Sequence, residues 1–247
     1  AFGAPFGNEL RAGEMEAVLA VAFCAILFLC VLGGYQRILA HIEPQRQSLY
    51  CVMVLLLQSG MMAQLFTNDV FTAYVFIEIM TIAAASLVLA RTRGRTLFAA
   101  TRYMIMNLLG SGLFLLGISV LYCLIGHLLM EDIHEQILKL YSTGAYTRPL
   151  MLSMVLITIG LAVKSALYPF HTWLPDAYAS ATPSSSAMLA SLVSKAYIFL
   201  YIKFVVRVFG LAVFQATHIQ TVLLVFSMVG IILGSIDAIL EKKLRRM

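Results

Sequence analysis

Long apolar runs dominate this chain, and short polar stretches separate them. An α-helix needs about 20 apolar residues to cross the hydrocarbon core of a bilayer, and seven of the runs reach that length. None of them alternates between apolar and polar residues, which favours helices over the strands of a closed barrel. We therefore predict an all-α transmembrane bundle with seven spans, at about residues 15–35, 48–66, 70–90, 97–126, 149–170, 184–206 and 217–240.

The overall composition is that of an integral membrane protein. Hydrophobic residues make up 61% of the chain and charged residues 12%, with a mean hydropathy of +0.92, whereas a soluble domain is roughly 45–50% apolar and about 25% charged. No soluble domain interrupts the pattern, so residues 1–247 are expected to form a single membrane domain. The four cysteines lie inside apolar runs without a CxxC or Cys/His cluster. We therefore predict no metal site and no cofactor.

The loops alternate in charge. Three regions are basic: the loop with Arg37 and Arg46, the RTRGR loop from Arg91 to Arg95, and the C-terminal residues 242–246. With seven spans these regions share one side of the membrane, and Glu131 lies on the opposite side. Lys203 and Arg207 after the sixth span weaken the difference in charge between the two sides without reversing it. The positive-inside rule then places the N-terminus outside and the C-terminus in the cytoplasm or its equivalent. The net charge of +5 comes from basic residues in short loops, which set the membrane topology, and does not indicate nucleic-acid binding.

Three ionisable side chains lie well inside the predicted spans, namely Glu78 in the third, Lys164 in the fifth and Lys195 in the sixth. With a rise of 1.5 Å per residue, all three fall near mid-depth. A charge there costs at least about 2.5–3.5 kcal/mol, so it is retained for ion handling or for a structural ion pair. A lysine held between burial and a carboxylate can change its protonation with small movements. The pattern favours a proton relay, and a fixed Glu–Lys pair that only joins helices is the alternative.

A proline-rich stretch follows Lys164. Pro169 and Pro175 remove backbone donors and should break the fifth helix near its end, with irregular chain from His171 up to the sixth span. His171 lies seven residues after Lys164, about two helical turns, so it can continue the path to the surface. An interfacial histidine without such a role fits equally well. Asp176 is expected to cap the chain or pair locally, which makes it, with the two prolines, part of a structural hinge.

The residues around the two lysines resemble a known family. K-S-A-x-x-P-x-H-x-W-L-P-D-A runs from Lys164 to Ala177, T-P-S-S-S-A-x-L and a lysine run from Thr182 to Lys195, and F-x-E-x-M-T runs from Phe76 to Thr81. These motifs are similar to those of the antiporter-like membrane subunits of complex I (NADH:quinone oxidoreductase), of membrane-bound hydrogenases and of Mrp-type Na+/H+ antiporters. The similarity extends over almost the whole chain.

The resemblance implies a polytopic bundle in which residues 48–206 form one five-helix antiporter-like repeat with a broken helix. It also implies that Glu78 and Lys164 are an input pair and Lys195 is the connecting lysine. Subunits of this family carry a second, inverted repeat. That repeat has no counterpart here, so the chain is expected to be a fragment or a split subunit.

The function implied is translocation of protons, with Na+ exchange as an alternative, through Glu78, Lys164, Lys195 and His171. The expected partners are other membrane subunits, the ion and lipid, and any redox chemistry belongs to those subunits. An energy-transducing membrane is expected, with the prokaryotic cell membrane favoured over an organellar inner membrane. Two other hypotheses are a non-conducting structural subunit with fixed ion pairs and a stand-alone carrier for a small solute. The lack of a second repeat argues against the carrier.

Overall fold

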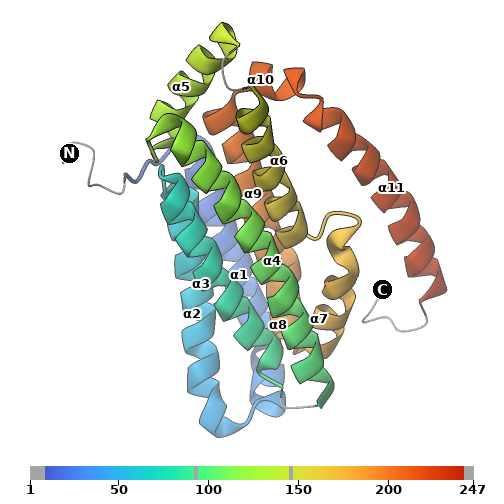
Figure 1. Ribbon diagram of the computed structural model, residues 1–247. Helices are drawn as coiled ribbons and strands as arrows, with labels where there is room; N and C mark the ends of the chain where they lie inside the picture. The colour runs from blue at the N-terminus through green and yellow to red at the C-terminus, as the bar shows by residue number, and fades with distance from the viewer. Residues whose placement is uncertain (1–8, 92–93, 145–146, 242–247) are drawn as a thin grey trace.

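The computed structural model describes residues 9–91, 94–144 and 147–241 (Figure 1). Arg93 and the basic C-terminal residues 242–246 of the predicted topology lie outside these ranges. The described ranges contain no β-strand, only two isolated bridges. Their α-helices are α1 (Glu14–His41), α2 (Pro44–Phe66), α3 (Val70–Leu89), α4 (Gly94–Ile125), α5 (Met130–Thr143), α6 (Thr147–Lys164), α7 (Leu174–Ser180), α8 (Pro183–Met188), α9 (Ser194–Phe204), α10 (Leu211–Ala216) and α11 (Ile219–Leu240).

Seven helical segments of the described chain are long and apolar enough to cross a membrane. They are α1 to α4, α6, the continuous run Pro183–Phe209 that contains α8 and α9, and α11. The run Pro183–Phe209 includes two π-helical turns, Leu189–Val193 and Val205–Phe209. The prediction of an all-α bundle with seven spans is therefore confirmed.

The helices α4 and α6 approach each other closely at glycines. A Cβ atom built on Gly110 would lie 2.9 Å from the carbonyl oxygen of Gly160, and one built on Gly160 would lie 2.7 Å from that of Gly110. Any side chain at either position would force the backbones apart. Small residues of this kind allow close packing of membrane helices. This packing fixes the position of the end of α6, where Lys164 lies.

The helix α11 is the least integrated span. No residue of its most apolar stretch is buried, and α10 connects it to the rest of the chain (Figure 1). Apolar side chains that are exposed in this way are stable facing lipid or another protein surface. α11 therefore leaves one side of the bundle partly uncovered.

The two ends of the bundle differ in the way the loop charges predict. The end of α1, the start of α2 and the end of α3 lie at the lower end in Figure 1, whereas α5 and α10 lie at the upper end and α11 runs from α10 part of the way down. α5 packs its apolar side, with Ile133 and Ile137, onto the bundle. Its Glu131 pairs with Arg11 of the N-terminal segment. The acidic α5 thus lies opposite the end of α1 that carries Arg37.

This sidedness predicts the outcome of labelling with a membrane-impermeant thiol reagent. In a chain whose native cysteines are replaced by alanine, we expect Gln45→Cys and Ser142→Cys to react from opposite faces of sealed vesicles, because these exposed positions lie at opposite ends of the bundle. Comparing right-side-out with inverted vesicles measures this directly. Reaction of both positions from the same face would contradict the seven-span topology.

The fifth span breaks where the sequence indicates, but the chain beyond the break is more regular than predicted. α6 ends at Lys164, and the expectation of irregular chain up to the sixth span is wrong. A 3₁₀ turn, Phe170–Trp173, leads directly into α7. Pro175 lies in the first turn of α7, where a missing N–H breaks no helical hydrogen bond. Pro175 thus lies at the start of α7 and does not end a helix.

Candidate functional site

Glu78 and Lys164 meet inside the bundle. α3 supplies Glu78 and α6 ends at Lys164, and Lys164 Nζ lies 3.9 Å from Glu78 Oε1. The side chain of Lys164 is 0% exposed and that of Glu78 is 22% exposed. A buried ammonium has to be compensated by an opposite charge or by hydrogen bonds. The structure therefore brings together the first two residues of the predicted relay.

A threonine gives Lys164 its closest polar contact. Lys164 Nζ donates a hydrogen bond of 2.8 Å to Thr81 Oγ1, and the Thr81 hydroxyl donates its own hydrogen to the carbonyl oxygen of Ile77, also at 2.8 Å. Because this hydrogen is committed, the Thr81 oxygen faces Lys164 as an acceptor. Tyr197 completes the site, with its ring centroid 5.3 Å from Lys164 Nζ and its hydroxyl 3.4 Å from Thr81 Oγ1.

Thr81 and Tyr197 were not predicted from the sequence. Thr81 follows Glu78 by three positions, so both side chains lie on one face of α3, and this spacing was the available signal. Tyr197 follows Lys195 by two positions, which places the two side chains on different faces of α9. The tyrosine faces the core, where it is 0% exposed, and the lysine faces outward.

The end of α6 favours a cation at Lys164. After Lys164 the chain turns, and Ala166 adopts a left-handed conformation with φ 58°. The last carbonyl groups of a helix carry a partial negative charge that stabilises a nearby cation. The side chain of Lys164 is held by Thr81 and Glu78, and the partial charge at the end of α6 favours the same positive charge.

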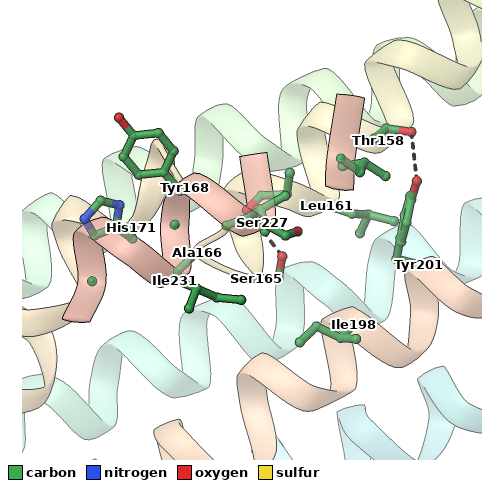
Figure 2. Close-up of a pocket in the computed structure, with 15 residues that line it drawn as sticks. Thr158, Leu161, Ser165, Ala166, Tyr168, His171, Ile198, Tyr201, Ser227 and Ile231 are labelled. Atoms are coloured by element: carbon green, nitrogen blue, oxygen red, sulfur yellow. Dashed lines mark hydrogen bonds between the residues drawn. The ribbon is translucent and has the colours of Figure 1, made fainter. Parts of the chain in front are cut away.

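A cavity of about 600 Å³ lies beside this break, between α6, α9 and α11 (Figure 2). Its polar lining residues are Thr158, Ser165, Tyr168, His171, Tyr201 and Ser227. The rings of Tyr168 and His171 stack with centroids 5.5 Å apart, and the hydroxyls of Thr158 and Tyr201 lie 3.4 Å apart. Nδ1 of His171 is buried and has no hydrogen-bond partner among the described residues. A roomy cavity with unused polar atoms is able to hold water.

His171 and Lys195 do not contact Lys164. Within the described ranges, no hydrogen bond or ion pair links either residue to it, and Lys195 Nζ donates at 2.7 Å to the carbonyl oxygen of Ala190 in the π turn. Single π turns inside helices are frequent at functional sites. The site thus consists of a buried centre, Glu78–Lys164–Thr81, with His171 and Lys195 at separate places around it.

The hinge residues also have specific partners. Asp176 Oδ2 accepts a hydrogen bond of 3.0 Å from Nη1 of Arg102, which lies on another helix, α4. Pro169 lies in the turn between α6 and the 3₁₀ segment. The Arg102–Asp176 ion pair connects the start of α7 to α4, and this connection restricts movement of the chain after the break in the fifth span.

Two further groups of buried charge were missed from the sequence. Lys203 is 3% exposed and donates to the carbonyl oxygens of Leu65 at 2.8 Å and Thr67 at 2.5 Å. Arg207 pairs with Glu16 of α1 at 2.5 Å, and Glu16 is 2% exposed. The interpretation of Lys203 and Arg207 as loop charges is wrong because the sixth span continues to Phe209.

The described chain is a polytopic helical bundle in which α6 ends at a buried lysine, next to a carboxylate on another helix. The family model described as "NADH:quinone oxidoreductase/Mrp antiporter, TM" matches residues 67–247. The chain belongs to this family. The family resemblance predicted from the sequence motifs is thereby confirmed.

Similar proteins are found in both branches of the family. The chain is 32% identical to NADH-quinone oxidoreductase subunit N of Desulforudis audaxviator over 98% of its own length and 47% of the relative's. It is 28% identical to a Na(+)/H(+) antiporter subunit of Bacillus subtilis over 78% of its length and 38% of the relative's. The chain thus spans about half the length, or less, of the curated relatives it matches.

Solved structures show the same fold. A chain of the archaeal membrane-bound sulfane sulfur reductase superimposes with a TM-score of 0.73 at 27% identity, covering 83% of this chain and 40% of that one. A chain of respiratory complex I from Thermus thermophilus superimposes with a TM-score of 0.71 over 99% of this chain and 50% of that one. At 22% identity the second match concerns the fold alone.

Proposed function

We propose that this chain translocates protons as an antiporter-like membrane subunit, and that Glu78 and Lys164 are its central exchange site. One observation carries the proposal: a fully buried lysine lies 3.9 Å from a carboxylate, at the end of a broken helix. Ionisable residues inside membrane spans are costly and characteristic of ion pathways. The buried centre also includes a neutral hydrogen-bond acceptor, Thr81.

Glu78 and Thr81 give Lys164 two alternative polar partners. While Glu78 is ionised, the carboxylate attracts the ammonium group, and the proton stays on Lys164. When Glu78 is protonated or moves away, burial favours the neutral amine, which can still hydrogen-bond to the Thr81 hydroxyl. Lys164 can therefore lose a proton without leaving its place. The movement required is small, because Thr81 and Glu78 lie on the same face of α3.

The cavity beside the α6 break offers a route for the proton. Ser165, which follows Lys164 directly, lines it, and His171 lies in the same lining. Water in this cavity would connect His171 with the end of α6, and a histidine exchanges protons near neutral pH. Lys195, on the outward side of α9, is the candidate for passing the proton onward from residues 48–206, the proposed antiporter-like repeat.

The names of the relatives support a role within a larger assembly. They are subunits of NADH-quinone oxidoreductase and of Na(+)/H(+) antiporters, and these relatives are bacterial. We infer that this chain acts with other membrane subunits in a prokaryotic cell membrane, and that redox centres belong to those subunits. Na+ in exchange for H+ is the alternative ion, which flux measurements with and without sodium would distinguish.

The role of Thr81 can be tested by two substitutions of similar size. Thr81→Val removes the acceptor of Lys164 and is expected to lower proton flux about tenfold or more, because a buried amine loses a hydrogen bond worth about 1.5 kcal/mol or more. Thr81→Ser keeps the hydroxyl and should retain most of the flux. The measurement is the pH dependence of proton flux in vesicles that contain the assembled complex.

This comparison also separates conduction from a structural role. If Thr81 only stabilises packing, Thr81→Val will lower the amount of assembled complex while each remaining complex keeps its normal flux and pH profile. Equal flux per complex in the valine and serine variants would contradict the proposed role of the hydroxyl.

A further inference from the structure

A second cavity lies on the outer side of the bundle, away from the Glu78–Lys164 pair. It is a groove of about 560 Å³ between α1, α8 and the π turn Leu189–Val193. On α1 it is lined by Ile26, Leu29, Gly33 and Arg37, and on the other side by Ala187 and Ser191. Most of this lining is apolar, and α1 is otherwise largely exposed. An exposed apolar surface of this kind is stable against lipid or against another protein surface.

Two neighbouring glycines shape this groove. A Cβ atom built on Gly34 would collide with the side chain of Ser184, whose hydroxyl donates at 3.0 Å to the carbonyl oxygen of Cys30. Gly34 therefore holds α1 tightly against α8. A Cβ atom built on Gly33 would meet no heavy atom within 4 Å. The groove is thus closed at its floor by Gly34 and open above Gly33.

A cation lines one end of the groove. Arg37 follows Gly33 by one helical turn, its side chain is exposed, and it forms no ion pair with any residue that the structure describes. It lies near the end of α1 that carries the basic α1–α2 loop, the end expected to face the cytoplasm. An unpaired guanidinium at the membrane surface is suited to a phosphate group, which it binds with two parallel hydrogen bonds.

The length of the groove matches one leaflet. From Ile26 to Arg37 the helix rises about 16 Å at 1.5 Å per residue, and half of the hydrocarbon core is about 15 Å thick. A headgroup phosphate at Arg37 would therefore place its acyl chain along Leu29 and Ile26. A soluble anion would use only Arg37, and a zwitterionic lipid would be attracted less strongly by the guanidinium, because its own ammonium group offsets the phosphate charge.

We propose that this groove binds one anionic phospholipid of the cytoplasmic leaflet, with an acyl chain between α1 and α8 and its phosphate on Arg37. The proposal does not depend on ion translocation, since the groove shares no residue with the Glu78–Lys164 centre. A lipid bound there would pack against Ser191, in the π turn that precedes Lys195. It would thus cover an otherwise open part of the α1–α8 contact.

The test uses the protein purified in its native membrane complex and exposed to dioleoylphosphatidylglycerol or dioleoylphosphatidylcholine. Lipid retained on the released subunit is measured by native mass spectrometry. Gly33→Leu adds an apolar side chain to the groove at a position where its Cβ atom meets no heavy atom within 4 Å, and its control is Gly112→Leu, because Gly112 of α4 is also exposed and has no heavy atom near its Cβ position. Arg37→Gln removes the cation, and its control is Arg148→Gln, an exposed arginine at the first turn of α6.

We expect the unaltered protein to retain phosphatidylglycerol about fivefold better than phosphatidylcholine, the preference that one arginine near a charged surface provides. Gly33→Leu should abolish retention of both lipids, and Arg37→Gln should remove only the preference. The two control variants should behave like the unaltered protein. Inorganic phosphate at millimolar concentration should not displace the lipid, because the acyl chain supplies the remaining affinity.

Three results would overturn the proposal. Equal retention of both lipids by the unaltered protein would show that Arg37 does not select a headgroup. Equal loss in Gly33→Leu and Gly112→Leu would show that retention is not located in the groove. Loss of a neighbouring subunit in Gly33→Leu, with lipid retention unchanged, would show that the groove is a protein interface.

Discussion

Replacing Lys164 with alanine is expected to reduce proton translocation by the assembled complex at least about hundredfold, the lower range of what a positioned acid–base group contributes. Glu78→Gln should have a similar effect, because the neutral amide cannot hold the proton on Lys164 by its charge. Both substitutions leave the Gly110–Gly160 packing of α4 and α6 intact, so the subunit should still assemble. The measurement is proton flux in sealed vesicles, normalised to the amount of complex.

The matched control is Lys139→Ala. Lys139 is an exposed lysine of α5, outside the seven candidate spans. Its removal should leave both assembly and flux unchanged. If Lys164→Ala abolished assembly and the few intact complexes still conducted normally, the alternative of a fixed structural ion pair would be correct.

Replacing Lys203 with methionine is expected to destabilise the fold rather than to block the proton path. Lys203 Nζ satisfies the carbonyl oxygens of Leu65 and Thr67, where α2 ends. Leaving a buried polar group without its partner costs about 1–3 kcal/mol. With two carbonyl groups affected, we expect a clear loss of thermal stability, measured as the temperature at which the detergent-solubilised complex dissociates.

Lys195→Met provides the comparison for this effect. Lys195 is exposed, and among the described residues it bonds only to the carbonyl oxygen of Ala190 in the preceding turn, so its removal should leave thermal stability almost unchanged. If Lys195 passes the proton onward, its replacement should lower flux. Equal stability of the Lys203 and Lys195 variants would contradict the structural role assigned to Lys203.

Features that depend on chain periodicity and composition were predictable from the sequence. The length of the apolar runs gave seven spans, and the isolated charges Glu78 and Lys164 indicated a pair because few charges are tolerated at that depth. The break after Lys164 followed from the prolines. The helix α7 was missed because Pro175, interpreted as a breaker, is also a favourable residue for a first helical turn.

Other features depend on packing that no pattern in the sequence encodes. Lys203 binds backbone carbonyl groups, which are present at every residue, so its sequence neighbours do not reveal its partners. The π turn Leu189–Val193 has no signal in the sequence pattern, so the directions of the side chains after it, Lys195 outward and Tyr197 towards Lys164, were not predicted. The spacing of Thr81 from Glu78 shows that both lie on one face of α3, but it does not show that Thr81 contacts Lys164.

The most direct test of the central claim is proton flux in Lys164→Arg. Arginine keeps the positive charge next to Glu78 but does not release its proton at accessible pH. If Lys164 exchanges protons, this variant will assemble like the unaltered protein and its flux will fall to the level of Lys164→Ala. Full flux in Lys164→Arg would show that the site needs only a fixed charge, and would contradict proton exchange at Lys164.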